Sequence, residues 1–471
     1  MPPHPHRTSA GHLLHGLLMG TLCLSPCSAT AAEEVKKPPL ASALLSNGNK
    51  LSGNRISVEN GHLTVESDQL QKPAKLKLDQ VLSLQFVHPP LERPEGLEAL
   101  LNFQPGFRMR TADSLAGELL SINKDSVVFK TNDTGTKTIK RTFISSIETL
   151  QTGENYYRGP NSALEWGINA DNTSWMFTRN HLNSLSNGGI GRDIKLAEKS
   201  HVSFQARWET SMRFRLHLYS SDHNDDSPDA NYDLNFNRSY VYLRTRGKID
   251  ANGGSIASGG RWTQLNLPRE ITKAKFDIYT DRKTGKIILY IDNLKTAELD
   301  SQSPDPRNLG TGIRFIAEER YPIKISDITI RPWDGVSIPT QPAPGAAPKQ
   351  QHPFLFSTDG KIHAFTALKK ENKDYVITSP DKTTNRFQAV DVIKMVLPPT
   401  EAEQPKKFIN DIRVQFQHGG QMTLQLNNIS DGKLHGHSKL LGDLTYDLRA
   451  FSLIDFNIYD HKYDKLRENK Q

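Results

Sequence analysis

The stretch Val81-Leu-Ser-Leu-Gln-Phe86 decides the fold, because its apolar pattern closes a unit that recurs along the chain. Apolar residues stand at its first, fourth and sixth positions. The same apolar spacing occurs at Val390, Ile393 and Met395 and at Phe451, Ile454 and Phe456. A further copy has Ile144 and Ile147 but carries Thr149 in the last position. Upstream, Asn49-Lys-Leu-Ser-Gly53 aligns with Asp113-Ser-Leu-Ala-Gly117. An internal repeat of this kind predicts one supersecondary unit that is used four times.

Each copy is expected to be a small β-barrel of the SH3 or Sm type. The predicted modules span 42–88, 106–151, 353–398 and 409–458. Their short β-biased runs alternate with pairs such as Asn60-Gly61 and Asp359-Gly360, which supply the positive φ angles of tight hairpins. Units of roughly 45 residues are near the lower size limit for a stable domain. We therefore expect the copies to pair in tandem. A separate expectation is a helical turn at Leu97 to Leu101, in the linker before the second copy.

The centre of the chain, 158–334, has longer runs in which apolar and polar residues alternate. Val202, Phe204, Ala206 and Trp208 show this pattern. Period-two burial predicts two antiparallel sheets packed face to face. A jelly-roll sandwich is the natural assignment for a segment of this size, so the predicted fold class is all-β. A Pro- and Ala-rich linker, 335–352, follows the sandwich.

Composition excludes some classes of partner. Charged residues make up 24% of the chain and the formal net charge is +7, with basic and acidic residues interleaved. A nucleic-acid partner is therefore not expected. Beyond residue 32, no apolar run is long enough for a transmembrane helix.

Residues 1–32 have the pattern of a secretory signal peptide. Arg7 precedes the apolar stretch from Leu13 to Leu24, and Ala29-Thr-Ala31 offers a small-x-small cleavage site. The segment also holds Cys23 and Cys27, which are the two cysteines of the chain. We therefore expect an exported, thiol-free mature protein in the periplasm, the cell envelope or the extracellular space.

Lipid attachment at Cys27 is the alternative to simple cleavage of this segment. Bacterial lipid attachment uses a small residue immediately before the cysteine, and Pro26 stands there. Pro26 therefore disfavours this alternative.

A family resemblance rests on strand patterns of the centre. They are Gly191-Arg-Asp-Ile194, Val202-Ser-Phe-Gln-Ala-Arg-Trp208, Lys275-Phe-Asp-Ile-Tyr279, Ile288-Leu-Tyr-Ile-Asp292 and Ile325-Ser-Asp-Ile-Thr-Ile-Arg-Pro332. This segment resembles the concanavalin A-like (LamG-type) sandwich of secreted planctomycete and verrucomicrobial proteins, and its ending is similar to that of the 3-keto-disaccharide hydrolase-like family. The flanking modules are similar to small barrels that accompany such sandwiches. The resemblance implies recognition of sugars or glycoconjugates in a cell envelope, although this fold hosts lectins, enzymes and scaffolds alike.

The sequence favours binding over catalysis. Retaining glycosidases of this fold class place two or three carboxylates two residues apart on one strand. No Glu-x-Asp-x-Glu pattern or near variant is present, and Asp277 and Asp281 are four apart, with Asp281 in a hairpin turn. We expect a non-catalytic protein whose partner is a glycan or an envelope protein. The alternative is a carbohydrate-active hydrolase of the 3-keto-disaccharide hydrolase-like class that uses the sandwich cleft.

Aromatic and arginine side chains gather on the polar faces of two predicted strands of the centre. They are Arg213, Arg215, His217, Tyr240, Tyr242, Arg244 and Arg246. If the two strands are neighbours, aromatic rings and planar guanidinium groups share one surface that suits a glycan, with affinity for carboxylate or sulfate. The structural interpretation is an exposed sheet face stabilised by cross-strand Tyr/Arg pairs.

The loop between those strands is acidic. It contributes Asp222, Asp225, Asp226, Asp229 and Asp233. Hard cations bind several oxygens from one flexible loop, so a calcium site is a hypothesis for this segment. The spacing matches no EF-hand loop, and a solvated loop is the alternative. No other cofactor is expected.

All five tryptophans lie in the centre. Trp208 and Trp333 alternate in phase with apolar neighbours, which predicts core positions for both. Trp166 and Trp175 stand in irregular sequence, which favours them as exposed rings for a sugar.

Overall fold

The computed structural model describes 40–68, 70–87, 98–104, 113–151, 154–168, 173–221, 230–247, 260–265, 267–301, 309–336, 352–398 and 406–469. These residues belong to one compact unit, Pro38–Gln471. The predicted signal peptide, both cysteines and most of the linker 335–352 lie outside the described residues. The predicted all-β fold is confirmed, since the short helix α1 (Asp464–Asn469) is the one α-helix of the described part. None of the helices in these ranges has the length and apolar character of a membrane span.

Four small modules surround the central segment in sequence. The first comprises β1 (Leu40–Leu45), β2 (Lys50–Gly53), β3 (Arg55–Glu59), β4 (His62–Glu66), β5 (Ala74–Lys77) and β6 (Val81–Val87). The second comprises β7 (Ala99–Phe103), β8 (Ser114–Ile122), β9 (Ser126–Thr131), β10 (Gly135–Lys140) and β11 (Ile144–Thr149). The third comprises β26 (Phe354–Ser357), β27 (Ile362–Ala364), β28 (Ala367–Glu371), β29 (Asp374–Thr378), β30 (Thr384–Gln388) and β31 (Val392–Val396). The fourth comprises β32 (Asp411–Phe416), β33 (Gly420–Ser430), β34 (Lys433–Ser438), β35 (Gly442–Asp447) and β36 (Phe451–Asp455).

The four modules share one antiparallel order. The closing strand pairs with one edge of the first strand, the second strand pairs with its other edge, and two further strands follow. In the first and third modules the second strand is divided, into β2 and β3 and into β27 and β28. A short 3-10 turn precedes each closing strand: η1 (Leu78–Gln80), η2 (Arg141–Phe143), η4 (Ala389–Asp391) and η5 (Leu448–Ala450). The aligned glycines have one function, because a Cβ at Gly53 or Gly117 would clash with the carbonyl oxygen of a crossing strand. The sequence repeat is therefore a repeat of structure.

The closing signature of the third module lies two residues later than the sequence pattern indicates. Val390 is 47% exposed and belongs to η4, whereas Val392, Met395 and Leu397 are buried. Both frames have the same apolar spacing. The 3-10 turn occupies Ala389–Asp391 and delays the start of the strand, so the pattern alone selected the wrong frame.

The expected helical turn before the second module is also wrong, because Ala99–Phe103 forms strand β7. This strand pairs with β8 and with β11. The run Ala-Leu-Leu-Asn-Phe suits either a helix or a strand by composition, and the two neighbouring strands decide the outcome.

The closing strands of the first and second modules do not pair with each other, and neither do those of the third and fourth. Instead β6 of the first module pairs with β36 of the fourth, with Leu84 opposite Ile454. Likewise β11 of the second pairs with β31 of the third, with Ile147 opposite Met395. These pairings bury the edges that isolated modules would expose. They also join the buried residues of all four modules into one cluster, whereas separate cores were expected.

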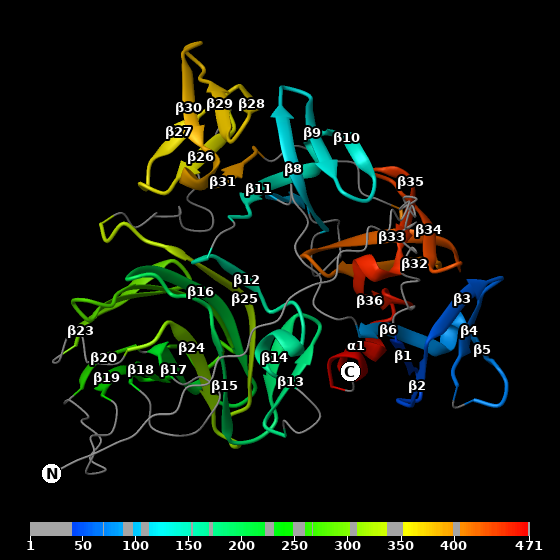
Figure 1. Cartoon of the computed structure of the whole chain (residues 1–471), viewed down its shortest axis with the longest axis horizontal. Coiled ribbons are helices and arrows are strands. Elements are labelled where there is room, and N and C mark those ends of the chain that lie inside the picture. Colours follow the sequence, from blue (N-terminus) through cyan, green and yellow to red (C-terminus); the bar gives the residue numbers. More distant parts are fainter. Residues whose placement is uncertain are drawn as a thin grey trace, which may run out of the picture. The chain divides into compact units, whose positions relative to one another are not determined.

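The central segment forms a two-sheet sandwich, drawn in green in Figure 1. One sheet contains β12 (Tyr157–Gly159), β13 (Trp175–Thr178), β14 (His181–Ser184), β16 (Lys199–Trp208), β21 (Lys273–Asp281), β22 (Lys286–Ile291), β23 (Leu294–Asp300) and β25 (Ile323–Pro332). The other contains β15 (Gly188–Asp193), β17 (Arg213–Ser220), β18 (Asn231–Asn237), β19 (Tyr240–Arg246), β20 (Arg261–Gln264) and β24 (Gly312–Ala317). We call them the eight-stranded and the six-stranded sheet.

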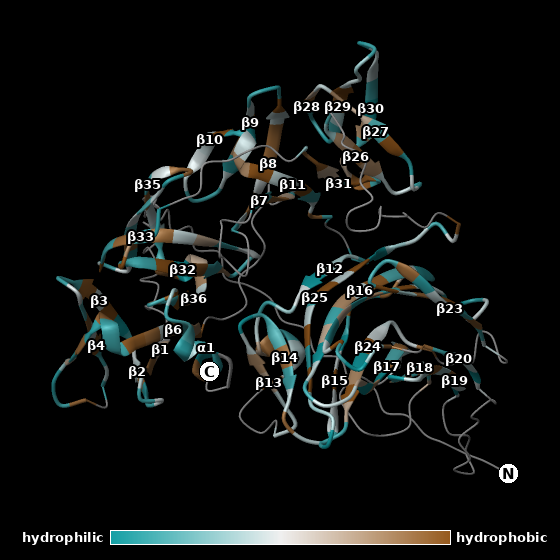
Figure 2. Ribbon diagram, turned by 180° about the vertical axis from the view of Figure 1, so that it is seen from behind, coloured by the Kyte–Doolittle hydropathy of each residue, from teal (hydrophilic) through white to brown (hydrophobic). Residues whose placement is uncertain are grey.

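Alternation of apolar residues builds the core between the two sheets. Phe204 and Phe276 of the eight-stranded sheet stack at 5.1 Å, and Phe214 of the six-stranded sheet packs edge-on against both. Figure 2 shows hydrophobic residues along the strands and hydrophilic ones in turns such as the one between β8 and β9. Among the described residues, this core is a cluster separate from that of the modules. The remaining 3-10 turns are η3 (Leu164–Trp166) and η6 (His461–Tyr463).

Candidate functional site

The seven residues predicted to bind a ligand lie on the outer face of the six-stranded sheet. Arg213, Arg215 and His217 belong to β17, and Tyr240, Tyr242, Arg244 and Arg246 belong to β19. The condition that the two strands are neighbours is not met, because β18 lies between them. Asn235 of β18 stands in register with both Arg215 and Tyr242. The predicted face therefore spans three strands, and β18 contributes to it.

Asp233 is the electrostatic centre of this face. Arg215 donates to its carboxylate from Nε and Nη2 at 3.0 and 2.6 Å, and Arg246 donates from Nε at 3.1 Å. Burial alone would raise the pKa of Asp233, but Arg215, His217 and Arg246 hold this pKa below its usual range. The ion pairs fix two planar guanidinium groups on the sheet surface.

Asp233 was also a predicted calcium ligand, and the structure places it among cations instead. Its two oxygens accept hydrogen bonds from guanidinium groups, which compete with a metal ion for the same lone pairs. Asp222, Asp225, Asp226 and Asp229 lie outside the described residues. Within the described ranges, no group of three or more His, Cys, Asp or Glu side chains could hold a metal ion.

Exposed aromatic rings occupy the edge of the same face. Trp262 of β20 is 66% exposed and stands in register with Tyr242. Tyr240 is exposed, and the guanidinium carbon of Arg244 lies 5.5 Å from the ring centroid of Tyr242. Rings that remain in water beside guanidinium groups form a surface suited to a flat, partly apolar and hydroxylated ligand.

The tryptophan predictions are partly wrong. Trp208 is buried as expected, and Trp333 is half-buried. Trp166 and Trp175 were expected to be exposed, yet both are buried, and their indole N–H groups donate to the Tyr157 hydroxyl and the Gly188 carbonyl. The irregular sequence around them packs against the core. Trp262, which no pattern singled out, is the exposed indole.

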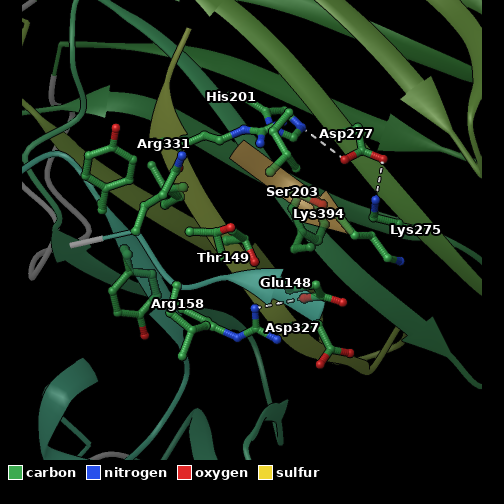
Figure 3. A pocket seen from close by; sticks show the side chains of 18 of the residues that line it. Glu148, Thr149, Arg158, His201, Ser203, Lys275, Asp277, Asp327, Arg331 and Lys394 are labelled. Carbon is green, nitrogen blue, oxygen red and sulfur yellow. Dashed lines mark hydrogen bonds and ion pairs between the residues drawn. The ribbon is translucent and has the colours of Figure 1, made fainter. Parts of the chain in front are cut away.

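A cavity of about 430 Å³ lies on the outer face of the eight-stranded sheet (Figure 3). No sequence pattern predicted a ligand at this place. Its lining includes His201, Ser203, Lys275, Asp277, Tyr279, Tyr290, Thr329 and Arg331 of the sheet, together with Glu148 and Thr149 of β11 and Lys394 of β31. The sheet residues come from four strands. Seven of them form two cross-strand rows, Arg331–His201–Tyr279 and Thr329–Ser203–Asp277–Tyr290, and Lys275 lies in the next row.

His201 is the centre of a hydrogen-bonded chain in this cavity. Arg331 Nε lies 3.0 Å from His201 Nδ1, and His201 Nε2 lies 3.0 Å from Asp277 Oδ1. The guanidinium N–H can only donate, so Nδ1 accepts and Nε2 carries the proton. Lys275 Nζ approaches the other oxygen of Asp277 at 3.0 Å. The ring of Tyr279 stacks on His201 at 4.3 Å.

The electrostatics agree with a neutral histidine. Burial, and then the charge of Arg331, lower the pKa of His201 to about 4. Burial would raise the pKa of Asp277, but His201 and Lys275 lower it well below the usual range. Both nitrogens of His201 are engaged, so the ring has no free lone pair with which to accept a proton from a ligand. The chain positions Arg331 and holds the carboxylate ionised.

Comparisons with known proteins show partial likeness in fold. No family model matches the sequence, and no curated protein matches it. A putative glycosyl hydrolase from Parabacteroides distasonis is 12% identical, with 35% of this chain and 92% of that chain covered and a TM-score of 0.22. The Bacillus licheniformis beta-glucanase is 9% identical, with 38% and 92% covered and a TM-score of 0.25. A Bacillus subtilis protein of unknown function with a galectin-like fold is 12% identical, with 39% and 97% covered and a TM-score of 0.26.

Proposed function

We propose that this protein is an exported, non-catalytic glycan-binding or scaffolding component of a bacterial cell envelope. The glycan would lie on the outer face of the six-stranded sheet. The sandwich would then be a LamG-type binding domain, and the four flanking modules would be SH3- or Sm-like small barrels that hold it in the envelope.

The pair Trp262 and Tyr242 carries this proposal. The two rings are cross-strand neighbours, and Trp262 is 66% exposed. A large exposed indole is disfavoured in water, and covering it with the apolar face of a sugar ring recovers hydrophobic free energy. Arg215 and Arg246, fixed by Asp233, add donors for hydroxyl, carboxylate or sulfate groups.

The alternative is a carbohydrate-active hydrolase of the 3-keto-disaccharide hydrolase-like class. Two-carboxylate glycosidases keep one carboxylic acid protonated near neutral pH by raising its pKa. The pKa values of Asp233 and Asp277, one carboxylate from each candidate surface, are instead lowered by their hydrogen-bond and ion-pair partners. Neither carboxyl would therefore serve as a proton donor, which supports binding over catalysis.

A glycan array probed with the wild type and with Trp262→Ala tests the proposal. The matched control is Leu294→Ala, which truncates an exposed apolar residue on β23 of the other sheet. We expect binding that Trp262→Ala reduces by about tenfold or more and Leu294→Ala leaves unchanged. An empty array, or equal binding by both variants, would contradict the glycan face. Release of sugar from a bound glycan would contradict the non-catalytic assignment.

A further inference from the structure

We propose that the cavity on the eight-stranded sheet is a second binding site, and that it takes the carboxylate of a small sugar acid on the guanidinium of Arg331. This site lies on a different sheet from the proposed glycan face and does not depend on it. A hexuronic acid has this chemistry, because it joins one carboxylate to a polyhydroxylated ring.

Arg331 is a cation whose polar partners carry no negative charge. Among the described residues it contacts His201 Nδ1 and the Tyr279 side chain, both of which are neutral acceptors. Among the described residues, no carboxylate lies within ion-pair distance of Arg331, and Asp277 is engaged by His201 and Lys275. Burial accordingly lowers the pKa of Arg331, with partial compensation from Tyr279 and Asp277. A cation withdrawn from water is stable when an anion completes its surroundings.

Neighbouring side chains hold the guanidinium of Arg331 in place. Asp277 fixes the tautomer of His201, and His201 in turn accepts from the Nε–H of Arg331. The stacked ring of Tyr279 holds the imidazole plane. The guanidinium therefore has a set orientation before a ligand enters, and its remaining N–H groups keep the planar geometry that matches a carboxylate.

The other walls specify the rest of the ligand. A row of cross-strand neighbours beside Arg331 carries Thr329, Ser203 and Tyr290, whose hydroxyl groups suit a polyhydroxylated ring. The volume of about 430 Å³ lies within the range of small-molecule sites. Arg158, which also lines the cavity, is neutralised by Glu148 at 3.0 Å, so the site calls for one negative charge rather than several.

Calorimetric titration of the full chain with D-glucuronate, D-glucose and sodium sulfate tests this proposal. We expect saturable binding of glucuronate and much weaker binding of glucose and sulfate. Arg331→Gln should weaken glucuronate binding by about tenfold or more, because it removes charge-assisted hydrogen bonds. Arg207→Gln is the matched control, since Arg207 is an exposed arginine on β16 that does not line this cavity.

Three results would overturn the proposal: no binding of glucuronate to the wild type, equal binding by Arg331→Gln, or sulfate binding as tight as that of glucuronate. If Arg331→Gln fails to fold, Arg331→Lys provides the comparison, because lysine keeps the positive charge but lacks the planar pair of N–H donors, and unchanged glucuronate affinity there contradicts the site. Trp262→Ala should bind glucuronate like the wild type. Ligand binding at this cavity and at the glycan face can therefore be tested separately.

Discussion

Trp262 stands directly opposite Tyr242 across strands β19 and β20, at the open edge of the six-stranded sheet. The register that brings them together also places Asn235 and Arg215 along the same cross-strand row. One row therefore combines the exposed ring of Trp262 and the half-buried ring of Tyr242 with a guanidinium that Asp233 holds in place. This combination of side chains distinguishes the proposed recognition surface from an ordinary solvated sheet face.

Asp233→Asn should destabilise the protein by about 2 kcal/mol, because it leaves two guanidinium groups without their counter-charge. The expected loss of unfolding free energy is smaller than for a fully buried ion pair, since the Arg215 and Arg246 side chains are each 25% exposed. Urea unfolding measures the change. Asn235→Ala, at the next outward position of β18, is the control and should lie within about 0.5 kcal/mol of the wild type. Equal stability of Asp233→Asn and the wild type would show that the ion pairs do not hold the face.

His201 should make stability depend on pH in the acidic range. Its pKa is lowered to about 4 in the folded protein, against the ordinary value of 6.5 in the unfolded chain. Between these values the unfolded state binds more protons, so stability falls as pH falls. The expected loss between pH 7 and pH 5 is roughly 2 kcal/mol from this group.

Denaturant unfolding of His201→Gln at the two pH values isolates this contribution, because the amide does not titrate. The variant should lose less stability than the wild type over this interval. His437→Gln, which replaces an exposed histidine on β34, should retain the wild-type difference. A His201→Gln protein with the full wild-type dependence would contradict a neutral, buried His201.

The frame of the third closing strand can be checked by truncation. Val392→Ala should cost about 2 kcal/mol, since it removes two buried methyl groups and leaves a cavity. Val390→Ala, two residues earlier on the exposed 3-10 turn, should cost less than about 0.5 kcal/mol. Thermal unfolding of the two variants makes the comparison, and the opposite ranking would restore the frame that the sequence pattern indicates.

Sequence periodicity predicted much of the fold. Alternation through Val202, Phe204 and Trp208 predicted one buried face, and all three are buried. The alignment of Gly53 with Gly117 predicted a repeated unit, and in the structure both glycines lie where a carbonyl oxygen of another strand approaches closely. Periodicity indicates which residues share a face of one strand. The small modules repeat the same apolar pattern, so each copy supports the assignment of the others. It does not distinguish two frames with identical spacing, as at Val390 and Val392.

The candidate sites needed information that a single strand does not contain. His201 and Asp277 are 76 residues apart, and His201 and Arg331 are 130 apart, yet they are neighbours across three adjacent strands. Each residue was visible as a polar position on the outer face of its strand. Which strands pair, and in what register, depends on the packing of the whole sandwich. The exposure of Trp262 follows from the same pairing.

The emission of Trp262 gives the most direct test of the central claim, that a glycan covers this indole. In the structure Trp262 is the exposed tryptophan, while Trp166, Trp175 and Trp208 are buried and Trp333 is half-buried. Titration with a glycan that binds on the array should shift the intrinsic fluorescence to shorter wavelength, as the indole leaves water. The shift should vanish in Trp262→Phe. A glycan that binds without changing the emission, or a shift that persists in Trp262→Phe, would contradict the assignment of the glycan to this face.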